Sequence, residues 1–171
     1  PVSGLDILPT LCAVADIPVP SDRVLDGTNV LPVFKGKSLK RTKPLYWQFN
    51  RARNAAKVAI RDGEWKLLAR LDVPSLKPSG GITKQEIDHV KQAKLAEFEL
   101  YHIQSDIAET TDRSESEPKR FEQMKKQMQE IFEEVQAEAP RWPAWEFARY
   151  EGKILSEYYR KQAEAKKQQD K

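Results

Sequence analysis

The fold is decided by the stretch Lys57-Val58-Ala59-Ile60-Arg61-Asp62-Gly63-Glu64-Trp65-Lys66-Leu67-Leu68. Two short runs with strand-like composition, 57–61 and 64–68, flank the dipeptide Asp62-Gly63. An Asp-Gly pair between two such runs is the strongest short-range sequence signal for a β-hairpin. The stretch therefore predicts two antiparallel strands joined by a tight turn.

Further strands and helices are expected on both sides of this hairpin. Residues 45–49 and 98–101 read as strands, and the capping-box spacing that starts at Thr83 predicts a helix from there to about Ala96. A long helix begins at Pro118 and ends before Pro140, with an apolar stripe at helical spacing. The residues of this stripe are Phe121, Met124, Met128, Ile131, Phe132 and Val135. Several strands with one amphipathic helix predict an α+β unit.

The N-terminal stretch predicts a short helix. Asp6 is a suitable N-cap, which places Pro9 in the first turn, and Ser3 with Asp6 forms a rival capping box one turn earlier. The spacing predicts one buried face made of Leu8, Leu11, Cys12 and Ala15. Pro18 and Pro20 end the helix, and the prolines and glycines between Val19 and Pro44 predict a loop.

Charge is distributed unevenly along the 171 residues. The chain has 29 basic and 26 acidic side chains, yet nine basic residues and no acid fall between Lys35 and Arg61. This stretch is either a local positive field that attracts anions or a solvated face whose partners lie elsewhere in the fold. One cysteine and two histidines exclude an internal disulfide and a histidine-based metal cluster.

Three motifs, in this order, resemble the C-terminal third of sulfatases of the alkaline phosphatase-like superfamily. The first is Ser3-x-x-Asp6-Ile7-Leu8-Pro9-Thr10-Leu11, followed by Leu25-Asp26-Gly27 and Leu31-Pro32. The second is the hairpin Ala59–Leu68, and the third runs from Glu99-Leu100-Tyr101-His102-Ile103 through Asp106 to Glu109. The resemblance covers residues 1–138, and the chain starts at Pro1 as a cut end would.

The resemblance implies a place for each segment. Residues 1–43 would be the C-terminal end of a large catalytic α/β domain. Residues 44–139 would be the sulfatase C-terminal subdomain, a small antiparallel sheet packed on one long helix. Residues 140–171 would be a C-terminal extension with a basic tail. The catalytic domain that the N-terminal residues would complete is then the first expected partner of this chain.

The resemblance also implies a chemistry whose residues are not in this chain. Type I sulfatases hydrolyse sulfate esters with a formylglycine, made from Cys or Ser in a C/S-x-P/A-x-R motif, and with a divalent cation, usually calcium. Cys12 is followed by Ala13-Val14-Ala15-Asp16, which does not match that motif. We therefore expect no catalytic residue and no metal ligand here. Calcium and formylglycine are expected in the missing N-terminal part, and the fragment alone is expected to be inactive.

Substrate contacts are expected from the loop after the first strand of the small subdomain. In this sequence the loop residues are Asn50, Arg51, Arg53 and Asn54. As a hypothesis, Arg51 and Arg53 help to hold a sulfated small molecule or glycan. The alternative is that both are ordinary surface residues.

Two other functions are left open by the sequence. One is a phosphonate or phosphodiester hydrolase of the same superfamily, and the other is a non-catalytic module that binds polyanions through the basic stretch. No nucleic-acid partner is expected, because the aromatic residues match no RNA-binding pattern. No membrane partner is expected either, because no apolar run is long enough to span a bilayer. The family implies a periplasmic or secreted protein.

Overall fold

The computed structural model describes residues 1–39, 41–50, 56–76, 84–139, 156–157 and 160–161. The chain divides into two compact units, the first made of residues 1–47, 58–69 and 98–128 and the second of residues 48–57, 70–97 and 129–171. The predicted extension from residue 140 onward lies almost wholly outside the described residues.

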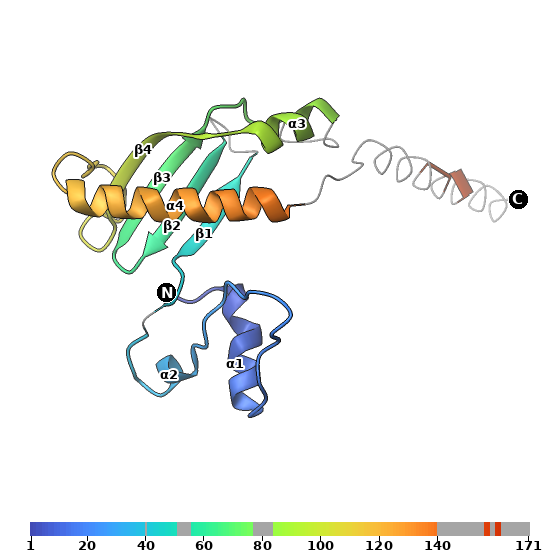
Figure 1. Cartoon of the computed structure of the whole chain (residues 1–171), viewed down its shortest axis with the longest axis vertical. Helices are drawn as coiled ribbons and strands as arrows, with labels where there is room; N and C mark the ends of the chain where they lie inside the picture. The colour runs from blue at the N-terminus through green and yellow to red at the C-terminus, as the bar shows by residue number, and fades with distance from the viewer. Residues whose placement is uncertain (40, 51–55, 77–83, 140–155, 158–159, 162–171) are drawn as a thin grey trace, which may run out of the picture. The chain divides into compact units, whose positions relative to one another are not determined.

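One sheet supplies strands to both units. Its strands are β1 (Leu45–Phe49), β2 (Lys57–Asp62), β3 (Trp65–Leu71) and β4 (Leu95–His102). They lie side by side in the order β1-β2-β3-β4, as Figure 1 shows. Together with the long helix α4 (Pro118–Glu138), the antiparallel sheet confirms the α+β class.

The predicted β-hairpin is confirmed, with its turn shifted by one residue. Asp62 still belongs to β2, and the two turn residues are Gly63 and Glu64. Gly63 has a φ of 58° whereas Glu64 does not have a positive φ, which is the pattern of a type II′ turn. The Leu71 amide donates to the Ala56 carbonyl at 2.9 Å, which fixes the register at the other end of the hairpin.

Side chains alternate across the hairpin between a buried and an open face of the sheet. On the buried face, Val58, Ile60 and Leu67 are fully buried and Ala69 is nearly so. In the first unit α4 adds Met124, also fully buried, and its Phe121 ring meets the ring of Phe98 on β4 edge to face at 6.4 Å. The predicted apolar stripe of α4 is therefore confirmed as a core-forming face.

The second unit joins the short helix α3 (Lys84–Gln92) to the end of α4. The Lys91 ammonium donates to the Gln136 carbonyl at 3.1 Å and to the Ala139 carbonyl, and the Gln136 side-chain amide donates to the Val90 carbonyl at 2.8 Å. Lys91 thus binds carbonyls that the last turn of α4 leaves without intrahelical partners.

The expected helix up to Ala96 is wrong at its C-terminal end. α3 ends at Gln92, and Leu95 and Ala96 already belong to β4. Glu97 has a φ of 47°, which a helix does not allow. Opposite β3, Asp72 pairs with Lys94 whereas Glu64 pairs with Ile103, so β4 carries one extra residue between these points. This extra residue is the signature of a β-bulge, and Thr83, the expected start, lies outside the described residues.

The N-terminal segment contains the 3₁₀ helix η1 (Gly4–Asp6), α1 (Ile7–Val14) and α2 (Leu31–Phe34). Of the two predicted N-caps the structure has Ser3, which forms the complete capping box with Asp6. The buried face of α1 was predicted wrongly. Cys12 is buried, but Leu8 and Leu11 are exposed, and Pro9 and Thr10 take their place. The expected loop between Val19 and Pro44 contains α2, with Pro32 in its first turn.

The described burial predicts different losses of stability when two isoleucines are replaced by alanine. Ile60 is fully buried, so Ile60→Ala should lower the free energy of unfolding by about 2–5 kcal/mol. Ile107 is 89% exposed, so Ile107→Ala should change it by no more than about 0.5 kcal/mol. Urea unfolding of both variants measures this, and equal losses would contradict the described core.

Candidate functional site

Of the four residues predicted to contact substrate, only Asn50 is among the described residues. Arg51, Arg53 and Asn54 lie outside them. Asn50 directly follows β1, and its carbonyl accepts a hydrogen bond from the Leu76 amide at 2.7 Å. Its side-chain oxygen accepts one from the Gln48 amide group at 3.2 Å. Asn50 is thus held in place, and the hypothesis about Arg51 and Arg53 stays a prediction.

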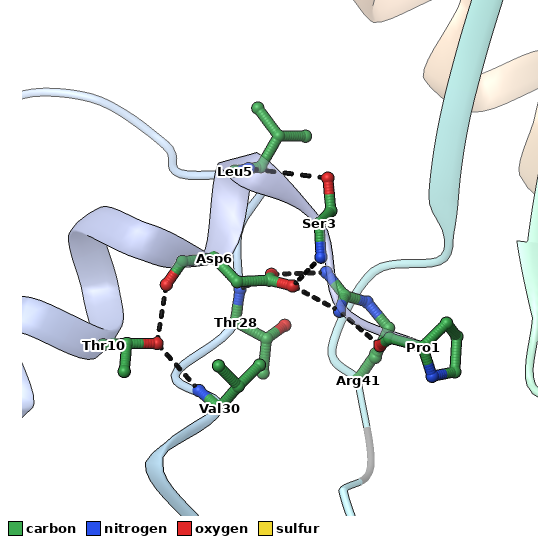
Figure 2. Close-up of polar contacts among 8 residues, drawn as sticks. All are labelled: Pro1, Ser3, Leu5, Asp6, Thr10, Thr28, Val30 and Arg41. Atoms are coloured by element: carbon green, nitrogen blue, oxygen red, sulfur yellow. Dashed lines mark hydrogen bonds and ion pairs between the residues drawn. The ribbon is translucent and has the colours of Figure 1, made fainter. Parts of the chain in front are cut away.

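The first sequence motif builds a polar cluster around the carboxylate of Asp6, shown in Figure 2. The Arg41 guanidinium donates to both carboxylate oxygens, at 2.9 and 2.6 Å. The backbone amides of Ser3 and Thr28 donate to the same carboxylate at 2.7 and 2.8 Å. Asp6 and Arg41 are both buried, with 2% and 8% of their side chains exposed. We call Asp6, Arg41 and the groups that they bind the Asp6 cluster.

Thr10 extends the Asp6 cluster toward α2. Its hydroxyl donates to the Asp6 carbonyl at 2.6 Å and accepts from the Val30 amide at 3.0 Å. The motif residues Asp6 and Thr10 therefore satisfy the backbone amides of Thr28 and Val30. These hydrogen bonds hold the N-terminal segment together.

The electrostatics of the Asp6 cluster favour a charged carboxylate. Hydrogen bonds from Arg41 lower the pKa of Asp6 from its usual 3.8 to about 2, against the opposing effect of burial, and the amides of Thr28 and Ser3 contribute to the decrease. A charged carboxylate buried without such partners would instead have a raised pKa.

The dipeptide Asp26-Gly27 of the first motif also has a structural explanation. A Cβ atom on residue 27 would lie 1.9 Å from the carbonyl oxygen of Leu5 and 2.6 Å from its carbon. Only glycine allows the two backbones to approach this closely. Asp26 in turn pairs with Lys43 at 3.0 Å.

The basic stretch 35–61 is partly neutralised inside the fold. Arg41 pairs with Asp6 and Lys43 with Asp26, and both carboxylates lie outside the stretch in sequence. Lys40, Arg51 and Arg53 lie outside the described residues. For Arg41 and Lys43 the partners therefore do lie elsewhere in the fold.

Among the described residues, neither Cys12 nor the potential metal ligands form a cofactor site. Cys12 is 5% exposed on the inner side of α1, so its thiol is not presented to a substrate. Within the described ranges, no group of three or more His, Cys, Asp or Glu residues could hold a metal ion. No helix in the same ranges combines the length and apolar character needed to cross a membrane.

Comparisons with known proteins agree with the resemblance to sulfatases. Over 38 residues the chain is 45% identical to human steryl-sulfatase, a match that covers 22% of this chain and 6% of the enzyme. A segment of the chain is similar to a sulfatase. This relationship confirms the resemblance to the C-terminal part of sulfatases that the three motifs indicated. No family model matches the chain.

One solved structure shares the fold over a larger part of the chain than the 38 matched residues. The structure of Ps i-CgsB is 28% identical, has a TM-score of 0.53, and matches 77% of this chain over 24% of its own. A Bacteroides thetaiotaomicron structure described with the metabolism of multiple glycosaminoglycans is 21% identical and has a TM-score of 0.45. This match covers 77% of our chain and 24% of the other chain. The chain thus spans about a quarter or less of the proteins that it matches.

The Asp6 cluster predicts a loss of stability at low pH. Because the pKa of Asp6 is lower in the folded than in the unfolded state, its contribution is complete above about pH 4 and disappears as the pH falls toward 2. Asp6→Asn should lower the free energy of unfolding by about 3–5 kcal/mol at pH 7, since it leaves the buried Arg41 unpaired. It should also make the free energy of unfolding less dependent on pH between about 2 and 4. The control Asp22→Asn removes an exposed pair with Arg23 and should have no measurable effect. Unfolding curves from pH 2 to 7 test both, and an unchanged Asp6→Asn profile would refute the assignment.

The contact between Gly27 and Leu5 predicts a second contrast. Gly27→Ala should lower the free energy of unfolding by about 1–3 kcal/mol, because backbone atoms must move to admit the methyl group. Gly4→Ala has nothing within 4 Å of the new Cβ and should be neutral or slightly stabilising. Thermal unfolding distinguishes them, and a neutral Gly27→Ala would contradict the close approach.

Proposed function

We propose that this chain is the C-terminal part of an enzyme that hydrolyses sulfate esters, with its catalytic centre in another part of the same protein. The observation that carries the proposal is the 45% identity to steryl-sulfatase over 38 residues. In this proposal residues 1–43 close the catalytic α/β domain and 44–139 form the C-terminal subdomain. Residues 140–171 are an extension, and formylglycine and calcium belong to the other part.

The exposed side chains of the N-terminal segment support a docking role. Leu5, Ile7, Leu8, Leu11 and Val14 are between 47% and 61% exposed along η1 and α1. Contiguous apolar surface of this kind marks an interaction site rather than a water-facing surface. The catalytic part of the protein is the partner that the sulfatase relationship suggests, because this chain spans only 24% of a solved chain that shares its fold.

The proposed substrate is a sulfated small molecule or carbohydrate. Arg51 and Arg53 are proposed to contact its sulfate, because guanidinium groups bind such oxyanions through paired hydrogen bonds. The described residues on either side of them form backbone hydrogen bonds, since the Leu76 amide donates to the Asn50 carbonyl and the Leu71 amide to the Ala56 carbonyl. A periplasmic or secreted location belongs to the same proposal.

The experiment compares the full-length gene product with the 171-residue chain. The full-length protein should release sulfate from an aryl sulfate and from sulfated oligosaccharides but should leave a diaryl phosphodiester intact, and the 171-residue chain should release none. In the same assay, Arg51→Ala with Arg53→Ala should lower kcat/KM on the oligosaccharide about 10- to 100-fold.

The matched control removes Lys35 and Lys37, two exposed cations of the same acid-free stretch. Lys35→Ala with Lys37→Ala should leave kcat/KM unchanged. Turnover by the 171-residue chain alone, or a full-length protein that hydrolyses only phosphodiesters, would refute the proposed function. An unchanged kcat/KM in the double arginine variant would refute the role of Arg51 and Arg53.

A further inference from the structure

The open face of the sheet carries a groove of about 400 Å³ within the first unit. It is lined from three neighbouring strands and from the turn after β4. The lining residues are Trp47, Ala59, Arg61, Lys66, Ile103, Ile107 and Glu109. Three strands span roughly 10 Å across a sheet, so the groove is wider than a single sulfate ion needs.

Two cations face each other at the centre of this groove. The hairpin register places Arg61 on β2 directly opposite Lys66 on β3, because Ala56 pairs with Leu71 and the turn consists of Gly63 and Glu64. Like charges in directly opposite positions of a sheet repel each other. The pair therefore needs negative charge nearby.

Among the described residues, Lys66 has an acidic partner and Arg61 does not. The Lys66 ammonium pairs with the Glu109 carboxylate at 2.6 Å, with both side chains about one quarter exposed. Arg61 donates through Nε to the Gly63 carbonyl at 3.1 Å, and among the described residues it forms no ion pair. Its two terminal nitrogens remain available to an anion.

An aromatic platform lies beside these charges. Trp47 on β1 is 48% exposed although indole rings are usually largely buried, and Ile107 at the other wall is 89% exposed. The negative face of an indole ring attracts the polarised C–H groups of a sugar ring. A concave apolar surface with a few converging polar groups is the usual composition of a small-molecule site.

We propose that this groove binds a sulfated saccharide, with a sugar ring stacked on Trp47 and its sulfate group bound by Arg61. The paired side chains of Lys66 and Glu109 then offer one donor and one acceptor to sugar hydroxyl groups. The inference rests on the proposed function, because it assigns a substrate subsite to the same enzyme. The site is separate from Arg51 and Arg53 and consists of described residues only.

The test uses the full-length protein and two classes of substrate. Trp47→Ala and Arg61→Ala should each lower kcat/KM on a sulfated tetrasaccharide about tenfold and leave kcat/KM on a small aryl sulfate unchanged, since in this proposal only the larger substrate occupies the groove. Calorimetry should show a similar tenfold weaker affinity for the tetrasaccharide, and its desulfated counterpart should bind less tightly than the sulfated one.

Two matched controls test whether the loss of any exposed arginine or aromatic side chain on the sheet would have the same effect. Arg70→Ala removes an exposed arginine on β3 that pairs with Glu97, and Phe49→Ala removes a 61% exposed aromatic of β1. Neither residue lines the groove, so neither variant should change tetrasaccharide affinity.

The outcomes distinguish the two proposals. If the aryl sulfate is not hydrolysed, the proposed function fails, while calorimetry still tests the groove. Equal losses of affinity in Arg61→Ala and Arg70→Ala, or inorganic sulfate binding as tightly as the tetrasaccharide, would overturn the saccharide site. Unchanged affinity in both Trp47→Ala and Arg61→Ala would do the same.

Discussion

The ion pair between Asp6 and Arg41 is the interaction on which the N-terminal segment depends. The described part of residues 1–43 contains a 3₁₀ helix and two short α-helices that bury few large apolar side chains, so polar contacts supply much of the cohesion. A buried carboxylate is tolerated only where donors compensate for the lost water. Asp6 finds these donors on Ser3, Thr28 and Arg41, three points far apart in this segment. The cluster thereby fixes the path of the chain.

This way of holding the segment together determines which side of α1 is exposed. Because Asp6 and Thr10 turn inward to satisfy the amides of Thr28 and Val30, the apolar residues of α1 point outward. A segment built from an apolar core would have the opposite arrangement. These exposed apolar side chains are the surface that we propose to meet the catalytic part of the protein.

Local patterns predicted the sheet and α4 better than they predicted α1. The hairpin and the stripe around Met124 and Met128 follow from spacing within one element. Which residues of α1 are buried depends on the contact between Asp6 and Arg41, which are 35 residues apart. The helical spacing of apolar residues within α1 carries no information about this contact. The start of β4 was missed because a bulge at Glu97 is a property of strand pairing and not of composition.

The groove on the open face was missed for a related reason. It joins Trp47, Arg61 and Glu109 through the register of three strands and a turn. Counting outward from the Gly63-Glu64 turn would have placed Arg61 opposite Lys66, and this was the signal available in the sequence. The predicted contacts Arg51, Arg53 and Asn54 follow from family resemblance, and only their neighbour Asn50 is described.

The central claim is that the first sulfatase-like motif, which contains Ser3, Asp6 and Thr10, is structural. Turnover of an aryl sulfate per folded molecule, measured for full-length Asp6→Asn beside its unfolding midpoint, tests this most directly. The account predicts a lower midpoint with turnover per folded molecule within about twofold of the unsubstituted protein, since a twofold change is only about 0.4 kcal/mol of activation free energy. Abolished turnover at an unchanged midpoint would contradict it.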